Sequence, residues 1–229
     1  MALLLAIETS ASRGDVALLR HGEVVGTRAL TLPRRHNEEL LAQVQSLLAA
    51  AAAAPGELAA VAYGSGPGSF TGVRLAAAAA LALAWASDLP AFAVGSAEAL
   101  ARKAWRQSAR APGPGMEVLV ALDARVNQLY LTHVDVDGTG VPRAAATQLL
   151  AWSQLDARAA TPGFAAIGDA WADPRMPAAL AHAARTLDAD GQPEATDVGA
   201  LAWQRWCAGE RPPAGTELPA YLRGADAWG

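Results

Sequence analysis

The sequence predicts an α/β protein of two lobes, each built around a mixed sheet. Two observations lead there: the order of apolar and helical segments in the first half, and the repetition of its opening in the second. A chain of 229 residues, 52% hydrophobic and 17% charged, is long enough for one large domain or two lobes with sizeable cores.

Short apolar runs bounded by turn residues predict the strands of the first half. Three of them, joined by short turns, predict an antiparallel meander, and helices then alternate with two further strands. Asn37 can cap the first helix, and Glu38 and Glu39 favour its positive end. The predicted strands are 2–7, 15–20, 23–32, 58–63 and 91–95, and the helices are 36–53, 71–87 and 96–109.

The second half opens as the first one does, after a break rich in proline and glycine at 110–117. The run 119–123 mirrors 4–8, since each is an apolar strand that ends in an acid and precedes a short turn and a second strand. Such a repeat indicates two lobes of shared topology. Helices are expected near 149–157, 177–186 and 196–209, and a strand at 164–168.

A meander followed by helix, strand, helix, strand and helix is the order of a ribonuclease-H-like lobe. Two such lobes in tandem make the actin-like (ASKHA) fold, with a first lobe at 1–109 and a second at 110–229. Proteins of that fold hold nucleotide in the cleft between the lobes. Acids at the ends of the two first strands are suited to a metal-bound phosphate, so Glu8, Thr9 and Asp123 are candidate nucleotide contacts. As isolated acids at turns, however, Glu8 and Asp123 are better explained as plain strand-end residues than as a site.

Composition and charge exclude several classes of function. A formal net charge of −4 argues against a general nucleic-acid binder, which needs clustered cations. Cys207 is the single cysteine, and the four histidines lack metal-ligand spacing, so no metal or cofactor is expected. Glu8 interrupts the apolar start, which predicts a strand rather than a signal peptide, and 75–86 is too short to span a bilayer. We therefore expect a cytoplasmic protein that does not associate with membranes.

The loop "YGSGPGSFTGVR" at 63–74 is the most distinctive stretch of the chain. Its glycines permit positive φ and close backbone approach, and Ser69 or Thr71 can cap the following helix. Such a loop can cradle a phosphate or make a tight strand-to-helix connection, and spacing alone leaves both readings open. It lacks the lysine of a Walker A loop and the spacing of a dinucleotide fingerprint or a hydrolase elbow. The residues that define the loop are Gly66, Pro67, Gly68, Ser69, Phe70 and Gly72.

The helices at 36–53 and 71–87 carry alanine and leucine on every side. Burial within one lobe accounts for one apolar face of a helix but not for apolar residues all round it. The pair therefore predicts a surface for another subunit. The expected interface residues are His36, Leu40, Leu41, Val44, Leu48, Thr71, Arg74, Leu75, Ala77, Ala80 and Leu81.

Four motifs, in order along essentially the whole chain, resemble those of the TsaB family, the bacterial tRNA threonylcarbamoyladenosine biosynthesis proteins. They are "LAIETS", "AYGSGPGSFTGVR", "ALDARVNQLY" and "PAYLRGADAW". The resemblance implies an actin-like fold and a subunit that supports TsaD, which transfers a threonylcarbamoyl group to the adenosine beside the anticodon of tRNA. It further implies a heterodimer with TsaD, a ternary complex that includes TsaE, a homodimer in isolation and only indirect contact with tRNA.

The resemblance also bears on catalysis, because TsaD carries a His-x-x-x-His metal motif on the helix after the fifth strand. Ser96 and Leu100 stand at those positions here, and leucine cannot ligate a metal. Glu8 stands where many relatives have aspartate. A non-catalytic partner subunit is therefore expected. The alternatives are an ATPase or kinase-like enzyme that uses the interlobe cleft and, from an older glycoprotease-like label, a peptidase, although no triad or zinc motif is visible.

Overall fold

The computed structural model describes residues 2–30, 36–108, 115–156 and 163–219. For residues 36, 37, 186 and 187 it describes the backbone only. The chain forms two compact units, which are described separately. Unit 1 comprises Met1–Ala99 and Pro193–Ala220, and unit 2 comprises Leu100–Gln192 and Tyr221–Gly229.

Unit 1 is built on a five-stranded mixed sheet in the order β3-β2-β1-β4-β5. The first three strands form the predicted antiparallel meander, and β4 and β5 add to β1 in parallel. The strands are β1 (Leu3–Glu8), β2 (Gly14–Arg20), β3 (Glu23–Leu30), β4 (Leu58–Gly64) and β5 (Ala91–Val94).

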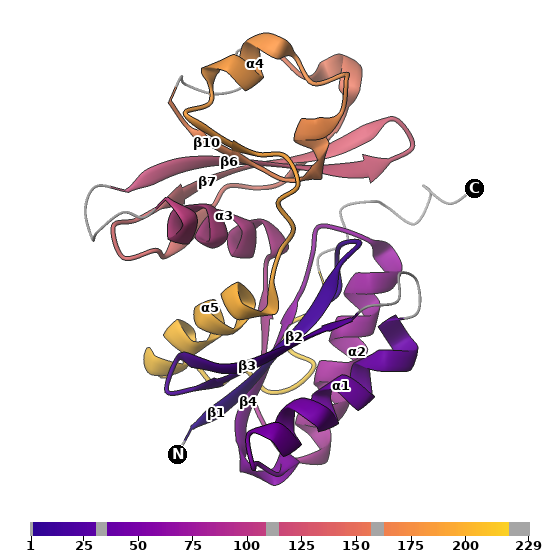
Figure 1. The fold of residues 1–229 in the computed structure, drawn as a ribbon, viewed down its shortest axis with the longest axis vertical. Coiled ribbons are helices and arrows are strands. Elements are labelled where there is room, and N and C mark those ends of the chain that lie inside the picture. The colour runs from indigo at the N-terminus through magenta and orange to yellow at the C-terminus, as the bar shows by residue number, and fades with distance from the viewer. Residues whose placement is uncertain (1, 31–35, 109–114, 157–162, 220–229) are drawn as a thin grey trace. The chain divides into compact units, whose positions relative to one another are not determined.

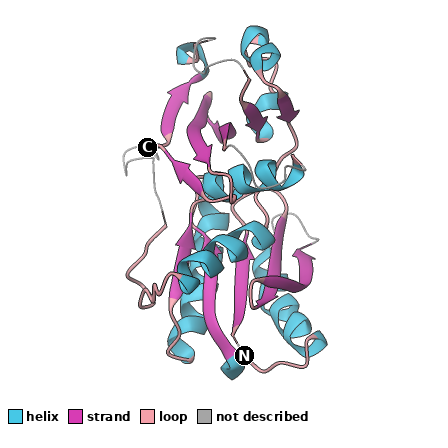
Figure 2. Ribbon diagram, turned by 90° about the vertical axis from the view of Figure 1, so that its left-hand side faces the viewer, coloured by secondary structure: helices cyan, strands magenta, loops and turns pink. Residues whose placement is uncertain are grey.

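Helices cover both faces of this sheet (Figures 1 and 2). Every residue of the central strand β1 is buried, and its side chains alternate between two cores. Leu3, Leu5 and Ile7 pack with α1 (His36–Ala50) and α2 (Phe70–Ala86). Leu4 and Ala6 pack with α5 (Ala195–Cys207) on the opposite face.

Unit 2 repeats this topology, with a sheet in the order β11-β10-β6-β7-β8. The central strand β6 again has an antiparallel meander on one side and parallel strands on the other, which confirms the predicted repeat. The strands are β6 (Met116–Arg125), β7 (Gln128–Val136), β8 (Pro142–Ala144), β10 (Ala165–Ile167) and β11 (Thr186–Asp188). α3 (Ser96–Gln107) runs across the boundary between the units, and α4 (Ala178–Ala183) lies within unit 2.

The helix expected near 149–157 is wrong. Gln148–Ala151 forms strand β9, which pairs with β7, and a single 3-10 turn (Trp152–Gln154) follows. The segment forms a strand because β7 offers backbone groups with which it pairs. The helix expected at 177–186 ends at Ala183, because Thr186–Asp188 joins the sheet as β11.

The division of the chain differs from the predicted lobes at its C-terminal end. The first boundary falls at Ala99 rather than at 109. In addition, Pro193–Ala220 belongs to unit 1 and not, as predicted, to the second lobe. The physical reason is that one face of the unit 1 sheet, which carries Leu4 and Leu19, needs apolar residues to cover it. The sequence between residues 1 and 99 supplies only part of that cover, and α5 supplies the rest.

Candidate functional site

An apolar groove lies between α1 and α2 on unit 1. Its volume is about 350 Å³, and its lining consists of Leu40, Leu41, Leu75, Ala79, Ala82 and Leu83. Leu41 is 56% exposed, so more than half of its surface is open to solvent at the groove. Two aromatic side chains of α2 are also exposed: Phe70 at its start and Trp85 near its end. The two helices therefore present an apolar groove and, at the ends of α2, two exposed aromatic side chains.

Several expected interface residues lie in the core instead and must be corrected. They face the sheet, because the inward side of each helix recurs every three to four residues. They are almost fully buried within unit 1 and are not available to a partner. The residues that belong to the core rather than to the interface are Leu40, Val44, Leu48, Ala77 and Ala80. Leu40 also lines the groove with its small accessible edge.

Leu41 and Leu75 are the two predicted interface residues that line the groove with accessible surface. Leu81 is half-buried against the core, Thr71 is exposed, and the Arg74 guanidinium lies 3.6 Å from the centre of the Phe70 ring. The side chain of His36 lies outside the described residues. The groove is also lined by Ala79, Ala82 and Leu83. These residues were not among the predicted interface residues, although they follow Leu75 at helical spacing.

The glycine loop is a tight strand-to-helix connection pressed against the end of β1. A β-carbon at Gly72 would lie 1.8 Å from the Thr9 carbonyl oxygen, and one at Gly68 would lie 2.4 Å from the Ser10 carbonyl oxygen. Real contacts of this kind do not fall below 3.0 Å, so both positions require glycine. Ser69 caps α2 by accepting a hydrogen bond from the Gly72 amide (3.4 Å), as the sequence predicts.

Amide groups of the loop donate to acceptors within the protein. The Ser69 amide donates to the Ser10 carbonyl (2.6 Å), and the Gly66 amide donates to the Ser96 hydroxyl (3.2 Å). The Gly66 carbonyl in turn accepts from the Ser96 amide (2.7 Å). Of the two readings of the loop, this geometry favours the structural one, because a phosphate cradle needs such amides free.

Glu8 and Thr9 are enclosed within unit 1. The Glu8 carboxylate accepts hydrogen bonds from the Ser10 amide (2.5 Å) and the Ser96 hydroxyl (3.4 Å), and the Thr9 hydroxyl donates to the Gly72 carbonyl (2.6 Å). Burial raises the pKa of Glu8, and these hydrogen bonds oppose part of that effect. Thr9 thus joins β1 to the glycine loop, and Glu8 joins β1 to Ser96. Both residues are buried and offer no surface to a nucleotide.

Asp123 lies in unit 2, at the end of β6, where its carboxylate is partly exposed. It accepts from the Arg125 amide (2.9 Å) and pairs with the Arg125 guanidinium (3.1 Å), while its own amide donates to Asp169 (2.9 Å). Burial, the largest cause, raises the pKa of Asp169, and the Asp123 charge adds to this. Among the described residues, no group of three or more acids, histidines or cysteines is placed to hold a metal ion.

Comparison with known proteins gives the family. The model of TsaD, tRNA N6-adenosine threonylcarbamoyltransferase, matches residues 25–174. The TsaB protein of Escherichia coli, named for tRNA threonylcarbamoyladenosine biosynthesis, is 30% identical over 98% of this chain and 96% of its own length. The chain belongs to the TsaB family.

Other matches agree with that family. The TsaB protein of Haemophilus influenzae is 36% identical over 57% of this chain and 53% of its own length. The solved structure of YeaZ from Pseudomonas aeruginosa is 31% identical, covers 97% of this chain and all of its own, and has a TM-score of 0.82. The two-sheet architecture of this TsaB-family chain is therefore shared by a solved relative.

In this TsaB-family chain, the two residues that are expected to replace the TsaD histidines are buried. Ser96 and Leu100 are both fully buried. The Ser96 hydroxyl lies 3.0 Å from the Ser10 hydroxyl and also contacts Glu8 and Gly66. Position 96 therefore serves to bind three segments of unit 1 together.

No described helix is long and apolar enough to cross a membrane.

Proposed function

We propose that this chain is a non-catalytic subunit of tRNA threonylcarbamoyladenosine biosynthesis. It acts with TsaD and TsaE in the cytoplasm, and TsaD transfers the threonylcarbamoyl group to the adenosine beside the anticodon of tRNAs that read codons starting with A. The family supports the pathway, and the α1–α2 groove is the single observation that supports the role of a partner subunit.

The groove is the surface that we assign to TsaD. Leu41, Leu75 and Leu83 provide aliphatic side chains, while Ala79 and Ala82 let another helix approach closely. A helical partner that fills the groove would remove Leu41 from water, and burial of a leucine side chain contributes about 1.5–3 kcal/mol. In the absence of TsaD, we expect the same surface to pair two copies of this chain.

The residues around the glycine loop support a non-catalytic role. Glu8 and Ser96 are two polar side chains near the loop, and both are fully buried and hydrogen-bonded to other parts of unit 1. Leu100 occupies the second position of the metal motif and has no donor atom. These side chains thus stabilise the fold at the place where TsaD carries its metal motif.

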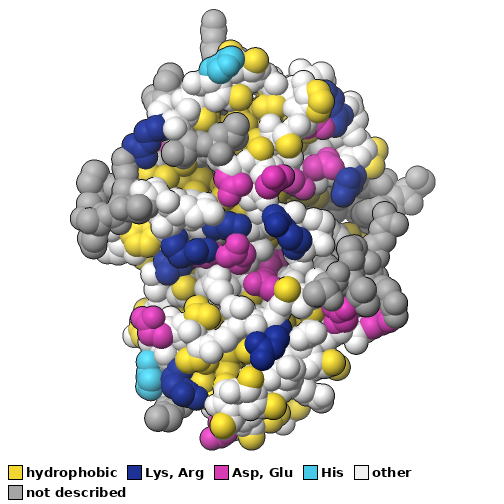
Figure 3. Space-filling model, viewed as in Figure 1, with side chains coloured by type: hydrophobic (Ala, Val, Ile, Leu, Met, Phe, Trp, Pro, Cys, Tyr) yellow, Lys and Arg dark blue, Asp and Glu magenta, His cyan; other side chains and the backbone are white. Residues whose placement is uncertain are grey.

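Contact with tRNA is proposed to be indirect. A protein that neutralises phosphates needs lysines and arginines gathered on one surface. On the face drawn in Figure 3, the basic side chains have acidic side chains beside them on the described part of the surface. The chain as a whole is also acidic, with a net charge of −4.

The groove is tested by Leu41→Asp. Because the side chain is already exposed, the variant should fold, while a charge in the groove should weaken association with TsaD by about tenfold or more. Val126→Asp is the matched control, since Val126 is an exposed apolar residue of unit 2 (77% exposed). Sedimentation of each variant with TsaD measures the affinity, and equal binding by both variants would refute the groove as the interface.

The role is tested by reconstitution. Purified TsaD and TsaE should modify tRNA efficiently with the wild-type chain, poorly without it, and poorly with Leu41→Asp. Modification at full rate without this chain would show that it is not a required subunit. Modification by this chain alone would show that it is an enzyme.

A further inference from the structure

The last described segment of unit 1, residues 209–219, runs along the outer edge of β5, and we call it the strap. α5 ends at Cys207, and Gly209 turns the chain with a φ of +91°. The Ala91 amide donates to the Pro212 carbonyl (3.0 Å), and the Trp85 indole N–H donates to the Ala214 carbonyl (3.1 Å). The strap is therefore held both to β5 and to α2.

β5 is the last strand of its sheet, so one side of its backbone has no strand beside it. The Pro90 carbonyl accepts a hydrogen bond from the Val61 amide of β4, and the Val94 carbonyl accepts one from the Ser65 amide, directly after β4. Since successive peptide groups of a strand point to opposite sides, the amides of Ala91 and Ala93 face outward. Ala91 donates to the strap backbone, and Ala93 donates to the Glu217 carboxylate (2.8 Å).

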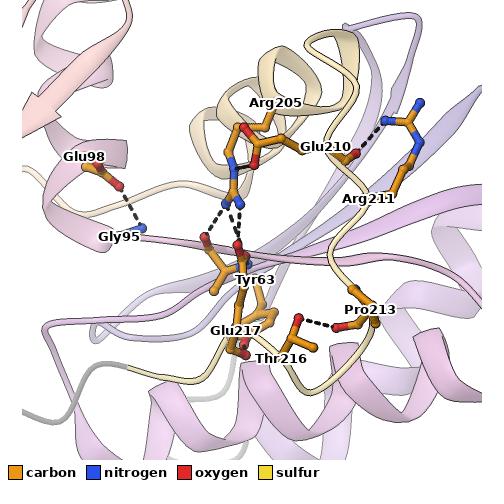
Figure 4. Close-up of polar contacts among 10 residues, drawn as sticks. Tyr63, Gly95, Glu98, Arg205, Glu210, Arg211, Pro213, Thr216 and Glu217 are labelled. Atoms are coloured by element: carbon orange, nitrogen blue, oxygen red, sulfur yellow. Dashed lines mark hydrogen bonds and ion pairs between the residues drawn. The ribbon is translucent and has the colours of Figure 1, made fainter.

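Glu217 anchors the strap through several bonds at once (Figure 4). Its carbonyl accepts from the hydroxyl of Tyr63 (2.6 Å), and its carboxylate forms an ion pair with the Arg205 guanidinium. Arg205 also donates to the Ala93 carbonyl (2.9 Å), so one arginine joins α5, β5 and the strap. Both ion-paired side chains are only 29% exposed, and a two-point pair of this kind is stronger than an ordinary surface pair.

The sequence of β5 explains why its edge needs cover. Ala91–Val94 reads AFAV and carries no charge, proline or bulge, which are the features that usually keep an edge strand from pairing. With the strap displaced, the outward amides of Ala91 and Ala93 would lose the acceptors that the strap gives them. The same edge would then be open in every copy of the chain.

We propose that the strap is a guard of the β5 edge, locked by Arg205 and Glu217, and that its release lets β5 pair with β5 of a second copy. The strap supplies the acceptors that an added strand would supply, at the same outward amides. A second copy is the occupant that the sequence favours, because two identical apolar edges can pair symmetrically in the antiparallel direction.

The experiment uses Glu217→Ala in the full chain that also carries Leu41→Asp, which removes any association through the α1–α2 groove. Glu210→Ala is the matched control, because Glu210 pairs with the same arginine (2.8 Å) but does not contact β5. Amide hydrogen exchange by NMR should show Ala91 and Ala93 exchanging at least about tenfold faster in Glu217→Ala than in the control. Amides that join β1 to β2 should keep their protection, and sedimentation should show a dimer that forms with rising concentration.

Tyr63→Phe provides a second variant, which keeps the buried ring and removes the hydroxyl group that donates to the strap. It should accelerate exchange at Ala93 in the same direction, by less than Glu217→Ala does. Unchanged exchange at both alanines, or an equal acceleration across all five strands, would overturn the guard. Faster exchange at the edge without a dimer would overturn the second copy as the occupant.

Discussion

Asp15 carries a carboxyl group whose surroundings oppose its ionisation. Burial raises its pKa from 3.8 to about 7, the charges of Glu8, Glu194 and Asp197 add to this, and the amide of Ala195 opposes it by donating a hydrogen bond (2.9 Å). The folded state therefore binds a proton at Asp15 that the unfolded state releases between pH 4 and 7. Folding stability should fall as the pH rises through this window, by at most about 4 kcal/mol from this residue.

Asp15→Asn tests this effect. The asparagine amide oxygen can still accept the hydrogen bond at the start of α5, but it carries no charge at any pH. The free energy of unfolding, measured in urea at pH 5 and pH 8, should decrease less with pH in the variant than in the wild type. A pH dependence identical in both proteins would contradict the raised pKa of Asp15.

Gly72 requires the absence of a side chain rather than a special φ angle. Gly72→Ala should destabilise unit 1 by about 3 kcal/mol or more, because the added methyl group meets the Thr9 carbonyl oxygen, and backbone cannot move aside as a flexible side chain can. Gly56→Ala is the control, since a β-carbon there would meet no atom within 4 Å. Thermal unfolding of the two variants measures the difference, and similar melting temperatures would contradict the close approach.

At the scale of the element, α2 separates a core face from an interface face within one turn. Ala80 is fully buried against the sheet, whereas Ala82 lines the groove and is exposed. Ala80→Asp should unfold unit 1, because it buries an unpaired charge. Ala82→Asp should leave the melting temperature nearly unchanged and weaken association with TsaD. Circular dichroism and sedimentation of the pair separate the two effects, and loss of folding in both variants would contradict the assignment of faces.

The elements also show how far the sequence determines the fold. The first meander, α1, α2 and the tandem repeat follow from local patterns, because each has its own periodicity and its own turn residues. β9 and β11 do not, since each is a short segment that becomes a strand only because β7 or β10 offers unpaired backbone groups. The same limit applied to the site. Leucine and alanine spacing identified the two helices of the groove, but only packing distinguishes Leu41 from Leu40.

At the scale of the whole molecule, the chain is not two consecutive lobes. α5 lies about 100 residues after the rest of unit 1 and still packs on its first strands. The contact is close, since a β-carbon at Gly199 would lie 2.3 Å from a methyl carbon of Leu19. The first sheet is therefore complete only after the last helix has been synthesised.

The dependence of unit 1 on α5 leads to a prediction about fragments. A fragment of residues 1–109 should show no cooperative unfolding transition, because Leu4, Ala6 and Leu19 would lie uncovered on one face of the sheet. Residues 1–99 joined to 193–219 through a flexible Gly/Ser linker should regain the transition. Leu201→Asp in the joined fragment is the control, since Leu201 is buried in the core under α5 and a charge there should abolish the transition again. Cooperative unfolding of residues 1–109 alone would mean that the first sheet does not need the C-terminal helix.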